Sequence, residues 1–238
     1  MRFRLPLGRR LFVLCAILFA LVALFPLRLA LDWLALDERG FAAREAKGSL
    51  WLGALSEAQF GSVELGDLQA RLRTLPLFVG RARMDLERGG DANPFRGSIT
   101  VSRHDFGIDD VTGVLDVGSA FAPLPIASLE LRDVDAHLTD GQCSRAEGLV
   151  KATIAGDIAD LSLPAGLSGN VRCDESALLL PLVSQTGMEA LNIRLFEDGR
   201  YEVDLAVRPT DDMMRDRLLA SGFSLTNNGY VLSASGQF

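Results

Sequence analysis

The sequence predicts a mainly β chain, in which one N-terminal transmembrane helix precedes an exported domain built on an antiparallel β-sheet with one or two short helices. Two observations predict this fold class. The chain begins with arginines and an uncharged apolar run, and most of the remainder alternates apolar and polar residues, as half-buried strands do. We therefore expect residues 1–10 in the cytoplasm, 11–31 in the membrane and 32–238 as one exported β-rich domain.

The N-terminal segment contains positively charged residues followed by an uncharged apolar run. The run extends from Leu11 to Leu27, and its seventeen residues rise about 25 Å as a helix, short of a ~30 Å hydrocarbon core, until Leu29–Leu31 extend it. Arg28 then lies near the far interface, where it can snorkel. No acidic residue precedes Asp32, so the positive-inside rule keeps the N-terminus in the cytoplasm. The arginines before the run are Arg2, Arg4, Arg9 and Arg10.

A cleaved secretory signal peptide is the main alternative, because it also begins with a basic region and an apolar region. Its apolar region is shorter and ends in a small-x-small cleavage site. Here the run continues to Leu27, and residues 28–33 offer no such site. Cys15 does not fit a lipoprotein cysteine, since Leu14 precedes it. We expect an uncleaved single-span anchor.

The exported part is acidic. Five of the 24 basic residues but none of the 31 acidic ones precede Asp32, so residues 32–238 carry 19 basic and 31 acidic groups, a net charge of about −12. Such a surface repels nucleic acid and anionic head groups, and no basic patch with interleaved aromatic residues occurs. Nucleic-acid binding is therefore excluded.

Two cysteines remain in the exported part, Cys143 and Cys173. An oxidising compartment permits a disulfide between them, which would close a loop of about thirty residues and contribute roughly 3 to 4 kcal/mol on the chain-entropy model. A metal site that uses His137 with both cysteines is the alternative. The chain holds only two histidines and no C-x-x-C, which argues against a metal.

Alternating segments predict at least six strands, and two short turn sequences predict hairpins in the last third of the chain. The turns are Glu197–Arg200 and Asn227–Tyr230, whose Asp-Gly and Asn-Gly steps tolerate the positive φ of tight turns. The loops at residues 89–94 and 121–125 are candidates for a division of the sheet into halves. The strand segments are 68–72, 81–87, 95–101, 111–117, 134–138 and 201–207.

Two short helices are expected. Residues 41–47, closed by Gly48, read as a helix near the membrane. A second helix follows Pro209, capped by Thr210, with Met214 and Leu218 on one face and Gly222 at its end.

No catalytic constellation is present in the sequence. The nucleophile elbow, the Walker loop, the dinucleotide-binding glycines and the zincin motif are all missing, so we expect no enzyme, no cofactor and no metal. Asp109-Asp110 and Asp133-x-Asp135 lack calcium-loop spacing and read as solvated strand faces and turns. His104 and His137 have no adjacent nucleophile.

The segment Gly48-Ser49-Leu50-Trp51-Leu52-Gly53 resembles the G-T/S-L/V-W-x-G signature of type II secretion system protein N. The resemblance extends over nearly the whole chain, through loose patterns of glycine and apolar residues. Gly48, Trp51 and Gly53 are the structural residues that it singles out, with Trp51 as a large anchor on an early strand. The later matches are Leu65–Leu68, Leu75–Leu77, the two cysteines with Gly148, Gly222-Phe223, Asn228–Tyr230 and Gly236.

The resemblance implies a single-pass inner-membrane protein with a periplasmic domain. It would be an accessory subunit of the machine that moves folded proteins across the outer membrane of Gram-negative bacteria, without enzymatic activity, and its partners would be other inner-membrane secretion subunits. The alternative is lipid handling, because a long sheet behind one membrane helix also resembles AsmA-like lipid-transfer proteins. The inner face of the sheet discriminates the two functions, since a carrier needs an open apolar groove and a scaffold needs a closed core.

Overall fold

The computed structural model describes residues 11–17, 20, 24–29, 41–89, 94–118, 120–155, 157–158, 161–162, 166–209 and 212–238. Strands dominate these residues. Residues 11–17 form an N-terminal helix, and two further helices are α3 (Thr74–Leu77) and α4 (Asp212–Ala220). The strands of the first half are β1 (Phe41–Ala42), β2 (Glu45–Ser49), β3 (Leu52–Phe60), β4 (Val63–Arg73), β5 (Ala82–Arg88), β6 (Phe95–Val101), β7 (Asp105–Asp116), β8 (Ile126–Thr139) and β9 (Gln142–Ile154). Those of the second half are β10 (Asp157–Ile158), β11 (Leu161–Ser162), β12 (Gly166–Asn170), β13 (Arg172–Asp174), β14 (Ala177–Val183), β15 (Glu189–Leu195), β16 (Arg200–Val207), β17 (Ser224–Thr226) and β18 (Gly229–Gln237).

Sixteen of these strands form one antiparallel sheet. The hydrogen-bonded order is β1-β3-β4-β5-β6-β7-β8-β9-β12-β14-β15-β16-β18-β17, while β2 pairs with β3 and β13 with β14. Strands that follow one another in the chain are mostly neighbours, because short turns connect antiparallel strands. The predicted mainly β, antiparallel fold is confirmed, and each of the six predicted strand segments falls on a strand.

The alternation that predicted the strands also decides which side chains are buried. In β16, Tyr201, Val203, Leu205 and Val207 are buried, and the residues between them are exposed or half-buried. Successive side chains of a strand point to opposite faces, so one face of the sheet is apolar.

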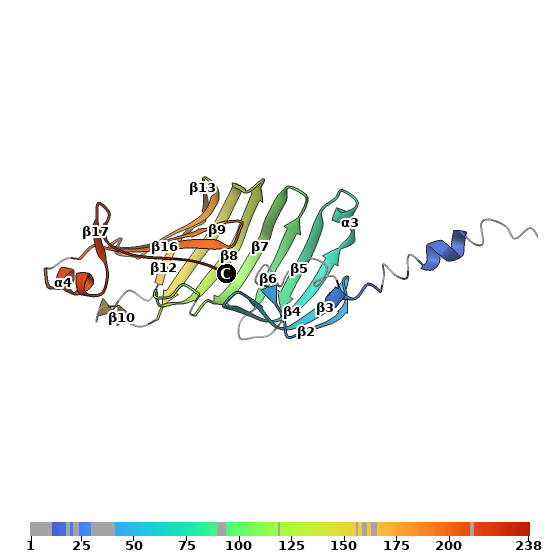
Figure 1. The fold of residues 1–238 in the computed structure, drawn as a ribbon, viewed down its shortest axis with the longest axis horizontal. Helices are drawn as coiled ribbons and strands as arrows, with labels where there is room; N and C mark the ends of the chain where they lie inside the picture. The colour runs from blue at the N-terminus through green and yellow to red at the C-terminus, as the bar shows by residue number, and fades with distance from the viewer. Residues whose placement is uncertain are drawn as a thin grey trace, which may run out of the picture.

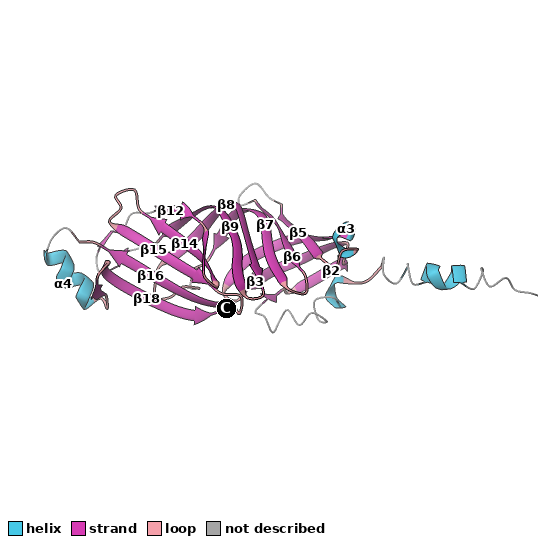
Figure 2. Cartoon of the chain, turned by 90° about the horizontal axis from the view of Figure 1, so that it is seen from above, coloured by secondary structure: helices cyan, strands magenta, loops and turns pink. Residues whose placement is uncertain are grey.

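The sheet is strongly twisted, and its apolar face packs against itself. Strands β5 to β9 run at a steep angle to β15, β16 and β18 (Figures 1 and 2). The buried side chains of both halves belong to one core cluster, from Leu68 in β4 to Val203 in β16. The sheet therefore supplies both walls of its own core.

Aromatic rings join the two ends of the sheet. Phe238, which follows β18, packs against Phe60 at the end of β3, with ring centroids 5.8 Å apart. The same ring lies 5.9 Å from Phe121 and 5.0 Å from Tyr201. Edge-to-face and tilted ring pairs of this kind add to the energy of burial.

Both predicted C-terminal hairpins are present. Residues between β15 and β16 form the first turn, in which Gly199 has φ +80° and Asp198 accepts hydrogen bonds from the backbone and side chain of Arg200. Asn227 and Asn228 form the second turn, between Thr226 and Gly229.

Helix α4 confirms the helix predicted after Pro209. Its residue Leu218 is buried, Met214 packs against the core, and Gly222 ends the helix with φ +89°. The predicted cap, Thr210, lies outside the described residues.

The helix predicted over residues 41–47 is wrong. Phe41 and Ala42 form β1, and β2 begins at Glu45, because both segments pair with β3. Hydrogen bonds between strands override a weak local preference for helix. The two loops considered as possible divisions of the sheet do not divide it among the described residues, since β5 pairs with β6 and β7 with β8.

No helix among the described residues is long and apolar enough to cross a membrane. Residues 18–19, 21–23 and 30–31 of the predicted span lie outside the described part of the chain.

Candidate interaction site

The signature segment forms the turn between β2 and β3, and the N-terminal segment lies against it. Leu50 and Trp51 form the two-residue turn, with Ser49 paired to Leu52. The backbone N–H of Leu50 donates to the carbonyl of Phe25 over 2.9 Å, and Pro26 forms a bridge with Ser49. This turn therefore ties the N-terminal segment to the sheet.

Leu27 is the side chain that fixes this contact. It is fully buried, although the sequence places it at the end of the apolar membrane run. A β-carbon added to Gly53 would overlap its side chain and would lie 3.1 Å from the carbonyl oxygen of Ser49. Gly53 therefore leaves the space that Leu27 occupies, and the folded domain begins before residue 32.

Gly48 has a different reason to be glycine. Its φ is +86°, and a β-carbon there would lie 2.5 Å from the carbonyl oxygen of Leu52. Only glycine adopts this conformation without strain at such close approach of two backbones.

Trp51 lies in the turn and is half-buried, whereas the sequence suggested a buried anchor on a strand. Its neighbour Leu50 packs against the core cluster from the other turn position.

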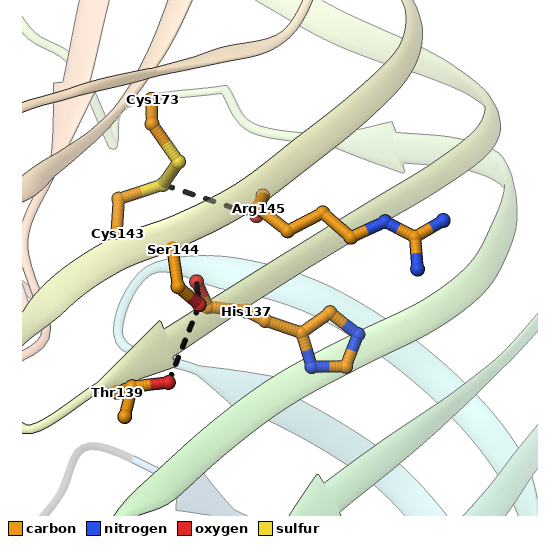
Figure 3. Close-up of a disulfide and its surroundings, with 6 residues drawn as sticks. All are labelled: His137, Thr139, Cys143, Ser144, Arg145 and Cys173. Carbon is orange, nitrogen blue, oxygen red and sulfur yellow. Dashed lines mark hydrogen bonds between the residues drawn. A yellow bond between two sulfur atoms is a disulfide. The ribbon is translucent and has the colours of Figure 1, made fainter.

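The predicted disulfide is present. Cys143 in β9 and Cys173 in β13 are bonded, with their α-carbons 5.3 Å apart (Figure 3). The bond holds the short β13 beside β9. Both sulfurs are thereby unavailable to a metal, and no group of His, Cys, Asp and Glu in the described residues could hold one. The ring of His137 points away from the disulfide in Figure 3.

His137 instead belongs to a polar ladder on the outer face of β4 to β8. Its Nε2 lies 3.0 Å from Oδ1 of Asp109, which also accepts a hydrogen bond from Thr100 over 2.8 Å. Further along, Asp85 accepts hydrogen bonds from Arg73 (2.7 Å) and Ser98 (2.8 Å). Each of these six side chains has a partner on a neighbouring strand, as cross-strand polar pairs do.

The pKa of Asp85 reflects these contacts. Burial raises the pKa, but the hydrogen bonds from Arg73 and Ser98 and the charges of Arg73 and Arg83 outweigh burial, so the pKa lies below its ordinary value. The arginine responds in the opposite direction, since its hydrogen bond to Asp85 raises the pKa of Arg73. Both shifts favour the ion pair.

The acidic residues considered for calcium serve the backbone. Asp110 and Asp133 have positive φ at irregular positions of β7 and β8. The carboxylate of Asp135 accepts the N–H of Asp110 over 2.9 Å, and Asp133 pairs with Thr112. These contacts satisfy backbone groups that bulges leave unpaired. His104 pairs with Asp140, and both residues are exposed.

A groove of about 600 Å³, lined by both polar and apolar side chains, lies on the outer face of β14 to β18. Its floor combines the small side chains of Ala190 and Ala206 with the polar Asn192 and Asp204, and the turn at Asn228 forms part of its rim. Sequence reasoning missed this groove. The small residues at outward positions of β15 and β16 are the signal that marks it.

Comparisons with known proteins agree on one family. A family model described as type II secretion system (T2SS), protein N, matches residues 39–233. A protein of Vibrio cholerae serotype O1 named type II secretion system protein N is 26% identical over 208 residues, which cover 80% of this chain and 81% of that protein. No solved structure matches.

Proposed function

Because the chain belongs to the type II secretion system protein N family, we propose that it is an accessory, non-enzymatic subunit of that system. The observation that carries the proposal is the extent of the family match, which takes in the sheet from β1 to most of β18. The subunit supports the export of folded proteins across the outer membrane through contacts with other inner-membrane secretion subunits.

We further propose that the N-terminal apolar run anchors the chain in the inner membrane, with residues 1–10 in the cytoplasm and the sheet in the periplasm. The arginines before the run and the absence of acids before Asp32 support this orientation. The side chains of Leu11, Phe12 and Leu14 are more than half exposed, so the described part of the protein does not cover them. The contact of Leu27 with Gly53 supports an uncleaved chain, because cleavage near residue 32 would remove a core residue.

The burial of the apolar face of the sheet favours a function as a scaffold and not as a lipid carrier. A carrier needs an open apolar groove, whereas Leu167, Leu182 and Val203 on this face are fully buried. The groove of β14 to β18 is on the opposite face, where the polar side chains of Asn192, Asp204 and Ser233 lie beside the apolar ones of Val183, Met188 and Val231. We therefore propose contacts on the outer face and no acyl-chain transport.

Crosslinking in intact cells tests this function. A photoreactive residue at Asn192, in the floor of the groove, is expected to capture other inner-membrane secretion subunits, and deletion of the gene is expected to reduce export of secreted proteins. Replacement of His104 or His137 by alanine should leave export near normal, because no chemistry depends on them. Normal export together with altered outer-membrane permeability and co-purified phospholipid would overturn the scaffold and favour the lipid alternative.

A further inference from the structure

The turn between β4 and β5 exposes a cluster of apolar side chains at one end of the molecule. Leu75, Phe78 and Val79 are 80%, 86% and 74% exposed, and Leu77 is 38% exposed. Single exposed apolar residues are ordinary, but four within five positions form a patch that marks an interaction site. We call these four residues the apolar tip.

The apolar tip lies at the end of the domain from which the N-terminal segment departs. The backbone N–H of Leu50 donates to the carbonyl of Phe25, and the carbonyl of Leu50 accepts from the N–H of Leu72 over 3.3 Å. Leu72 is two residues from the start of α3. Figures 1 and 2 both place α3 at the end that faces the N-terminal helix, and α4 at the opposite end.

The length of the apolar run places this end close to a bilayer. Leu27 belongs to the core of the domain, and fifteen residues of the apolar run, from Leu11 to Phe25, precede Pro26 in the sequence. As a helix they would rise about 22 Å, which is less than the ~30 Å of a hydrocarbon core. A short span is accommodated by local thinning of the bilayer or by snorkelling of flanking residues, so the residues that directly follow it lie near the membrane surface.

The charge around the apolar tip is also unlike that of the chain. The chain carries a net charge of −7, yet residues 68–84 hold four arginines and no acidic residue. Three of the four, Arg71, Arg73 and Arg81, are exposed around the tip, and Arg73 forms an ion pair with Asp85 just outside this stretch. Arginines beside exposed Leu, Phe and Val are typical of segments that rest in the interface of an anionic membrane.

We propose that the apolar tip inserts into the interface of the bilayer that holds the N-terminal anchor, so that the domain lies against the membrane at two points. The proposal rests on the proposed anchor. A second contact fixes the tilt and rotation of the sheet about the anchor, and it leaves the groove of β14 to β18 at the far end of the domain from the membrane.

Lipid quenching of a site-specific label tests the proposal on the full chain. Phe78→Cys, in a Cys15→Ser background, is labelled with an environment-sensitive fluorophore without reductant, which spares the disulfide. The protein is reconstituted into phosphatidylcholine vesicles, with or without phosphatidylglycerol, that contain phospholipid brominated on its acyl chains. Leu225→Cys with the same label is the matched control, because Leu225 is 68% exposed and lies in β17 near the opposite end.

We expect the label at residue 78 to shift to the blue and lose intensity to the brominated lipid, more so with phosphatidylglycerol present, while the label at residue 225 keeps its intensity. Equal quenching at both sites, or a vesicle-bound chain without quenching at residue 78, overturns the tip contact and leaves the anchor in place. A folded chain that does not stay with the vesicles overturns both. Capture of a protein, and not of lipid, by a photoreactive residue at position 78 in cells would assign the tip to a protein partner and overturn the proposal.

Discussion

Leu27 occupies the space in which a β-carbon on Gly53 would have to lie. This one contact joins the apolar N-terminal run to the first long strand of the sheet. The stability cost of replacing this glycine can therefore be measured, since any side chain at residue 53 would compete for space with a core leucine.

Gly53→Ala is expected to destabilise the protein by ~1–3 kcal/mol, the usual cost of overpacking, because the added carbon meets Leu27 and the carbonyl oxygens of Ser49 and Lys47. Urea unfolding of the full chain measures the change. Gly89→Ala is the control, since a β-carbon there meets nothing within 4 Å. Equal stability of the two variants would show that Leu27 does not pack as described.

Leu27→Ala is expected to cost more stability than Trp51→Ala. Removal of a fully buried leucine costs about 2–5 kcal/mol, and a buried tryptophan about 3–5 kcal/mol, but Trp51 is only half-buried. We expect a smaller loss at Trp51 than the about 3–5 kcal/mol of a fully buried tryptophan, because part of this residue remains exposed. Thermal unfolding of both variants ranks them, and a larger loss at Trp51 would contradict its place outside the core.

Replacement of Cys143 and Cys173 by serine is expected to lower the unfolding midpoint, because the bond closes a loop with a sequence separation of 30. On the chain-entropy model the loss is roughly 3–4 kcal/mol. Cys15→Ser is the control and should leave the midpoint unchanged, since Cys15 is a free, exposed cysteine. Alkylation without reductant should label neither Cys143 nor Cys173, and labelling of Cys143 would refute the bridge.

Acid should weaken the fold through Asp85. Its pKa is lower in the folded protein than in the unfolded chain, so its contribution to stability is fully present above a pH of about 4 and is lost as pH falls through the lower folded value. Asp85→Asn keeps the acceptor for Ser98 and removes the charge, so its free energy of unfolding should depend less on pH in that window. Glu202→Gln, at an exposed position, is the control and should keep the parent's pH profile.

The strands could be predicted because each carries its own two-residue period, and the hairpin turns because Asp-Gly and Asn-Gly steps act locally. The order in which the strands pair in the sheet could not be predicted. Nothing in the sequence of residues 41–47 shows that Phe41 will pair with Phe60 or Glu45 with Ser56. The local pattern therefore predicted a helix where the structure has two strands. The continuity of the sheet across residues 89–94 and 121–125 is likewise a property of partners and not of the loops.

The interaction site could be predicted only in part, because the sequence shows residue types but not their partners. Gly48, Gly53 and the cysteine pair stand out as residue types, and the structure gives each a partner. Leu27 did not stand out, because an apolar residue at the end of an apolar run looks the same whether lipid or protein covers it. Asp109 and His137 looked isolated in sequence, and only the alignment of β7 with β8 brings them within 3.0 Å.

The contact of Phe60 with Phe238 has a consequence for the order of folding. A chain is synthesised from its N-terminus, so β3 and β4 emerge long before β18. Most neighbouring strands can therefore pair in the order in which they are synthesised. The contacts of Phe60 and Phe121 with Phe238 can form only after the last strand has arrived. Contacts between distant segments form slowly, so closure of this aromatic cluster is the late step, and a nascent domain stopped short of β18 would present these rings to chaperones and proteases.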